Sequence, residues 1–178
     1  MVDRSGCITP TTVRCKPDAR LNVIMVLELL HRATETIDLR NFVNSNAGVV
    51  AIAKALEKNT CCTKLDLSGN HIGNAGAHAL AEALKKNTSL RFLGLRANKI
   101  GYSGLLALAE AVETNESLTS LQLGLNPLPR RQGKLDLQKR IGKKLKLNQK
   151  SRREEDEKAA EEARLAAEAE KKHNINFG

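Results

Sequence analysis

Side chains able to catalyse a reaction or hold a metal are few in this sequence and widely separated. The histidines stand at positions 31, 71, 78 and 173, and the cysteines at 7, 15, 61 and 62. No cysteines have the C-x-x-C spacing of a zinc site or stand beside a histidine cluster, and no phosphate-binding Gly-rich loop appears. The sequence therefore predicts a protein that is not an enzyme, with no catalytic residue, metal, cofactor or small-molecule substrate, and with free thiols.

Charge is the chemical property that is concentrated in one segment. Residues 130–153 carry 11 basic side chains and one acidic, whereas residues 154–178 carry 4 basic and 8 acidic. Dense positive charge binds acidic surfaces by charge neutralisation. We expect a basic anchor for an acidic filament surface or for rRNA, made of Arg130, Arg131, Lys139, Arg140, Lys143, Lys144, Lys146, Arg152 and Arg153.

The elements that would position these groups follow from an internal repeat. An apolar-x-apolar triplet recurs every 28 residues, at 37–39, 65–67, 93–95 and 121–123. Alternation over three residues is typical of a short strand, and the apolar residues that follow at i, i+4 spacing indicate a helix. A fixed period of this length predicts a solenoid in which each unit is strand, turn and helix.

Polar residues and glycines recur within the same period. Asn70, Asn98 and Asn126 follow the second strand leucine by three residues, so we expect their amides to form a ladder on unpaired backbone groups. The glycines at 48, 76 and 104 suit positions where the backbone packs closely or needs unusual dihedral angles. The asparagines at 59, 87 and 115 stand at the predicted helix ends, where a left-handed cap is favoured.

The stretch LDLSGNHIGNAGAHALAEALKKNTSLRFLGLRANKIG resembles the ribonuclease-inhibitor-like leucine-rich repeats of immune receptors, the Ran GTPase-activating protein and tropomodulins. The segment RNFVNSNAGVVAIAKAL is similar to the first repeat of the tropomodulin leucine-rich domain. The resemblance implies an α/β leucine-rich-repeat solenoid, a right-handed horseshoe arc of about four parallel strands. It implies little about function, because inhibitors, receptors and cytoskeletal proteins share the fold.

Both ends of the arc need a cover, because terminal repeats expose core. Residues 20–33 predict an N-terminal capping helix, and residues 134–172 a long, charged C-terminal helix. We therefore divide the chain into an N-terminal extension (1–19), a repeat domain with its caps (20–145) and a charged helical extension (146–178).

The outward strand positions predict a concave face for binding partners, as in other solenoids. Phe92 and Arg96 are its best anchors, because aromatic and arginine side chains dominate binding hot spots. The full set expected to contact a partner is Arg40, Lys64, Asp66, Phe92, Arg96 and Gln122.

Together these features predict a scaffold or adaptor subunit that binds other proteins of a large assembly, in a cytoskeletal, ciliary or axonemal setting. The main alternative is an RNA-contacting subunit of a ribonucleoprotein such as a mitochondrial ribosome; an inhibitor or GTPase regulator would need a longer arc. The N-terminal residues lack the apolar core of a secretory signal, and no apolar run is long enough to cross a membrane. The expected location is the cytoplasm, with the cytoskeleton or cilium as its setting and the mitochondrion as the alternative.

Overall fold

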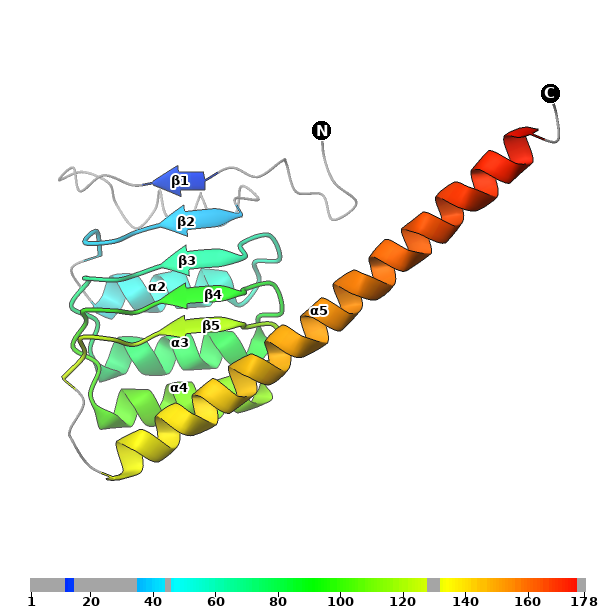
Figure 1. The fold of residues 1–178 in the computed structure, drawn as a ribbon. Coiled ribbons are helices and arrows are strands. Elements are labelled where there is room, and N and C mark those ends of the chain that lie inside the picture. Colours follow the sequence, from blue (N-terminus) through cyan, green and yellow to red (C-terminus); the bar gives the residue numbers. More distant parts are fainter. Residues whose placement is uncertain (1–11, 15–34, 44–45, 128–131, 176–178) are drawn as a thin grey trace.

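The computed structural model describes residues 12–14, 35–43, 46–127 and 132–175 (Figure 1). Five parallel strands form one sheet in the order β1-β2-β3-β4-β5. The strands are β1 (Thr12–Arg14), β2 (Thr36–Asp38), β3 (Lys64–Asp66), β4 (Phe92–Gly94) and β5 (Ser120–Gln122). The helices are α2 (Asn46–Leu56), α3 (Asn74–Lys86), α4 (Tyr102–Thr114) and α5 (Gln132–Ile175). Helices α2, α3 and α4 stack along one face of the sheet, and α5 crosses the end of the stack (Figure 1).

The 28-residue period sets the register of the sheet. Ile37 pairs with Leu65, Leu65 with Leu93 and Leu93 with Leu121, so equivalent residues of neighbouring repeats lie side by side. The first three of these side chains are fully buried against the helices. The predicted leucine-rich-repeat solenoid is confirmed, and its core is one continuous layer of aliphatic side chains.

The asparagine ladder forms as expected. The Asn98 side chain accepts hydrogen bonds from the backbone N–H groups of Asn70 (2.9 Å) and Ile72 (3.0 Å), and it donates to the carbonyl of Leu67 (3.0 Å). Asn70 and Asn126 make equivalent bonds one repeat earlier and later. Each buried amide therefore links two repeats through backbone groups that would otherwise lack partners.

The asparagines at the helix ends do not adopt the left-handed conformation that we predicted. Asn87 and Asn115 are extended, with φ of −77° and −82°. Their side chains instead form a second ladder: the amide of Asn87 donates to the carbonyls of Leu56 and Asn59, and its oxygen accepts from the N–H of Leu90. The side chain thus terminates the helix by hydrogen bonding, and a left-handed residue is not needed.

Positive φ angles occur instead at Asn41, Gly69, Ala97 and Leu125, each one residue before the position of the first ladder in its repeat, and also at His71. Gly76 and Gly104 serve close packing, the first of the two roles predicted for these glycines. A Cβ atom on Gly104 would lie 2.8 Å from the Cβ of Ala77 on the preceding helix.

Three further expectations have different outcomes. Strand β1 lies within the region predicted as an N-terminal extension, so the sheet has one strand more than predicted. The predicted capping helix at 20–33 lies outside the described residues. The boundary between residues 145 and 146 stays a prediction, since α5 runs through it.

The two adjacent cysteines differ. Cys62 is a buried free thiol, and burial raises its pKa to about 12. Cys61 is disulfide-bonded, so the expectation of free thiols is wrong for this residue. Among the described helices, none is long and apolar enough to cross a membrane.

Candidate functional site

The concave face brings the predicted partner-binding residues together in two groups. Lys64 and Phe92 are register partners on β3 and β4, and the Lys64 ammonium lies 5.1 Å from the centre of the Phe92 ring. Arg40 forms an ion pair with Asp38 at 2.7 Å and approaches Asp66 at 3.6 Å. The hydrogen bonds that the Arg40 guanidinium donates to Asp38 raise the pKa of Arg40. Arg40 is therefore already neutralised by its neighbours.

Arg96 and Gln122 lie at the other end of this face, where both are exposed. No described carboxylate forms an ion pair with Arg96. The surface beside these two residues has no projecting side chains at positions 94 and 124, because both are glycines. The concave face thus offers one cation–π pair and one unneutralised arginine on a shallow surface.

Helix α5 docks on the end of the stack through one stripe of residues. Leu137, Ile141, Leu145 and Asn148 are buried, and their i, i+4 or i, i+3 spacing places them on one face against α4. This contact fixes the rotation of the helix about its axis. It therefore decides which of the basic side chains face the solenoid and which face outward.

The basic anchor residues separate into two groups on this helix. Arg140 faces the solenoid and pairs with Glu113 of α4 at 2.6 Å, and Arg152 pairs with Glu155 and Asp156 at 3.3 Å. Lys139, Lys143, Lys146 and Arg153 follow one another at helical spacing on the exposed face and form no ion pair with a described residue. We call these four residues the outward stripe. Arg130 and Arg131 lie outside the described residues.

A shallow groove of about 560 Å³ runs along the docked part of α5. Its lining consists of Leu147, the lysines at 143, 144, 146 and 150, and the Arg140–Glu113 ion pair. Leu147 is 56% exposed although its neighbours are charged. The sequence pattern does not single out Leu147 as a binding residue, because its exposure depends on how α5 is rotated about its axis.

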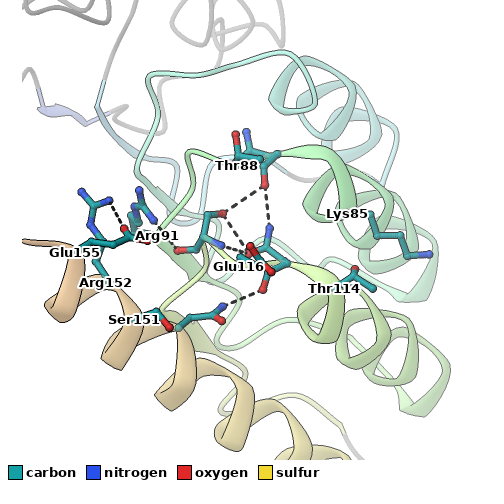
Figure 2. A pocket seen from close by; sticks show the side chains of 12 residues that line it. Lys85, Thr88, Arg91, Thr114, Glu116, Ser151, Arg152 and Glu155 are labelled. Carbon is teal, nitrogen blue, oxygen red and sulfur yellow. Dashed lines mark hydrogen bonds and ion pairs between the residues drawn. The ribbon is translucent and has the colours of Figure 1, made fainter.

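A second cavity, of about 330 Å³, lies where α5 passes the loops that follow α3 and α4 (Figure 2). Arg91, Arg152 and Glu155 lie at one end of it and Lys85 at the other. Burial lowers the pKa of Arg91, and the nearby Arg152 lowers it further. Because Glu155 and Asp156 offset the two arginines, this cavity carries little net charge.

The wall of this cavity contains the last rung of the second asparagine ladder. Asn148 of α5 donates to the carbonyls of Asn115 (2.9 Å) and Leu118 (2.8 Å), and Gln149 donates to the carbonyl of Thr119 (2.8 Å). Helix α5 thus supplies the hydrogen-bond donors that the asparagine of a following repeat would supply. The spacing of 33 residues from Asn115 hides Asn148 from a search at the 28-residue period.

Groups suited to catalysis are not assembled in the described part of the chain. His78 and Ser103 are within hydrogen-bond distance (2.9 Å) but exposed, and no carboxylate of a described residue hydrogen-bonds to the His78 ring. Among the described residues, no three His, Cys, Asp or Glu side chains could hold a metal ion. The geometry instead offers surfaces for binding: the concave face and α5.

The sequence matches the family described as the TMOD/LMOD leucine-rich domain over residues 22–152. This match confirms the similarity to the tropomodulin leucine-rich domain that the first repeat indicated. No curated protein sequence matches the chain.

Two solved structures are similar. One is titled "Leiomodin-1 Actin-Binding Site 2 (ABS2)"; it is 21% identical, has a TM-score of 0.60, and the match covers 76% of this chain and 96% of that one. The other is a tropomodulin C-terminal domain from Caenorhabditis elegans, 16% identical with a TM-score of 0.48, covering 74% of this chain and 96% of that one. The likeness to the leiomodin-1 structure supports the fold.

Proposed function

This chain belongs to the TMOD/LMOD leucine-rich domain family, and from that premise we propose that it is a non-catalytic protein-interaction module of the cytoplasmic cytoskeleton. Its proposed partner is the actin filament, because the similar leiomodin-1 structure is named as an actin-binding site. The repeat core supplies a rigid support, and the binding residues lie on its surface.

The observation that carries the proposal is the outward stripe of α5. Lys139, Lys143, Lys146 and Arg153 lie on a helix that is fixed by its buried face, so their charges are displayed at set positions. Because the helix backbone is already fixed, only the side chains lose conformational freedom on binding. An acidic protein surface of limited extent complements such a stripe.

The charge sequence of α5 favours a protein over RNA as the partner. From Lys139 to Arg153 the helix spans about 21 Å at 1.5 Å per residue. The next four residues, 154–157, are all acidic and exposed. A phosphate backbone that continued along the helix would meet these acids and be repelled, whereas a compact acidic patch would end before them.

The concave face is the proposed site for a second partner, which would make the chain a scaffold. Lys64, Phe92, Arg96 and Gln122 are the residues that we expect to contact it, and Arg40 and Asp66 would form the polar edge. In a ciliary or axonemal setting, the partner of the outward stripe would be the acidic surface of tubulin instead of actin.

Cosedimentation of the full chain with actin filaments and with microtubules tests the proposal. We expect binding to actin that weakens as salt is raised. The triple variant Lys139→Glu/Lys143→Glu/Lys146→Glu should lose at least tenfold in affinity. A matched control reverses three exposed lysines that lie elsewhere, Lys54, Lys58 and Lys99.

Equal loss of binding in both triple variants would mean that only net charge matters, and the proposed site would be wrong. Binding to microtubules alone would replace actin by tubulin as the partner. Retention of ribosomal RNA by the stripe, with no filament binding, would favour the ribonucleoprotein alternative.

A further inference from the structure

The groove on α5 combines two properties that seldom occur together on a solvated helix. Leu147 is 56% exposed at its centre, and lysines 143, 144, 146 and 150 surround it. The aliphatic stems of lysine side chains extend an apolar surface while their ammonium groups stay in water. The groove is therefore apolar at its floor and positively charged at its edge.

The positive charge of this edge is largely uncompensated. In the described part of the chain, Lys143, Lys144 and Lys146 form no ion pair, and Lys150 approaches Glu154 at 3.6 Å. The carboxylate of Glu113 is already occupied by Arg140. An occupant that brings its own carboxylates would therefore gain contacts that α5 does not satisfy by itself.

The apolar contact is limited to one residue. The other exposed leucines of the helix, Leu135 and Leu165, are separated from Leu147 by about 18 and 27 Å along the axis. A helix that lies in a lipid surface needs a continuous apolar face, and residues 135–168 of α5 expose none. The acidic residues 154–157 would also repel an anionic membrane.

We propose that this groove binds an acidic segment of a protein partner that presents one large apolar side chain with aspartate or glutamate on either side of it. The apolar side chain packs on Leu147, and its acidic neighbours pair with Lys143, Lys146 and Lys150. This inference rests on the proposed function, in that it specifies the chemistry of the partner surface that the outward stripe contacts.

A pair of leucines on one helix allows a matched experiment. Leu147 and Leu165 have nearly equal exposure, 56% and 53%, but only Leu147 lies in the groove. In actin cosedimentation with the full chain, Leu147→Asp should weaken binding at least tenfold and Leu165→Asp less than twofold. Circular dichroism should show that both variants keep their helix content, because both positions are exposed.

Filament binding that is unchanged by Leu147→Asp would overturn the inference and leave the proposed function intact. A wild-type chain that fails to bind filaments would overturn the proposed function. In that case a second measurement decides the inference alone.

The chain contains no tryptophan, so Leu147→Trp introduces a single fluorescent reporter. The probes are two synthetic peptides, EEEELEEEE and EEEESEEEE, which differ in one apolar side chain. We expect the leucine peptide to bind at least fivefold more tightly and to shift the Trp emission to the blue, with no shift in Leu165→Trp. Equal binding of both peptides, or a blue shift only with phosphatidylserine vesicles, would overturn the inference.

Discussion

Replacing Asn148 by leucine should weaken the docking of α5 on the repeat stack. This side chain is 4% exposed, and its amide donates to the carbonyls of Asn115 (2.9 Å) and Leu118 (2.8 Å). Leucine has a similar volume but no donor, so both carbonyls lose their partner. An orphaned buried acceptor costs about 1–3 kcal/mol, and water reaches this edge of the molecule in part, so we expect a total of about 2–4 kcal/mol.

The loss is measurable as a change in melting temperature. For a chain of this size it corresponds to a decrease of about 5–15 °C, followed by circular dichroism. Hydrogen exchange should also become faster in residues 135–150 of α5, because the docked part of the helix opens more often.

Gln149→Leu is the matched control. Gln149 is the adjacent residue and also donates to a carbonyl, that of Thr119 at 2.8 Å, but it is exposed. Water can replace this bond, so its loss should cost less than about 1 kcal/mol. Equal destabilisation by the two substitutions would refute the view that Asn148 acts as the last rung of the ladder.

Three further outcomes are expected. Gly142→Ala should stabilise the chain by about 0.5–1 kcal/mol, because a Cβ there meets nothing within 4 Å and alanine favours the helix; a loss of stability in urea unfolding would contradict this. Gly104→Ala should destabilise by about 1–3 kcal/mol in the same assay, since its Cβ would lie 2.8 Å from Ala77, and unchanged stability would show that the helices can separate freely. Burial raises the pKa of the Cys62 thiol to about 12 from an ordinary value of 9.0, so as pH rises this thiol ionises first in the unfolded chain. The free energy of unfolding should therefore fall by about 1.4 kcal/mol per pH unit between pH 9 and 12. The fall should be less steep in Cys62→Ala.

The fold was largely predictable because one period fixes several properties at once. Side chains repeated every 28 residues, such as Leu65 and Leu93, must lie in register if the repeats stack, and the structure confirms this. Strand β1 was not predictable in this way. Its central residue, Val13, pairs with Ile37, which is 24 residues away, so the spacing departs from the period.

The left-handed backbone conformation at the turns could not be predicted from the sequence. The left-handed position is filled by Asn41, Gly69, Ala97 and Leu125, four residue types with no shared chemistry. The N–H groups of Asn41, Gly69 and Ala97 donate to carbonyls just beyond the next strand, and these bonds support a conformation that costs a non-glycine residue about 1–2 kcal/mol. Backbone contacts between repeats thus decide the conformation, and the side chain leaves no sequence signal.

The candidate site on α5 was predictable in composition but not in arrangement. Basic residues at 139–153 are evident from the sequence. Which of them are paired depends on the docking of the helix, which turns Arg140 toward Glu113 and leaves Lys143 and Lys146 outward. The exposure of Leu147 follows from the same rotation.

The two asparagine ladders also bear on how proteins of this kind change size during evolution. Between residues 59 and 115 each junction repeats the same bond between residues 28 apart, whereas at the C-terminal junction Asn148 takes the place of a following unit. Duplication of one whole unit would reproduce an existing junction and leave both ends of the stack as they are. An insertion that moved the ladder asparagines out of register would break both ladders together, so duplication of a whole unit is the least disruptive way for the arc to lengthen.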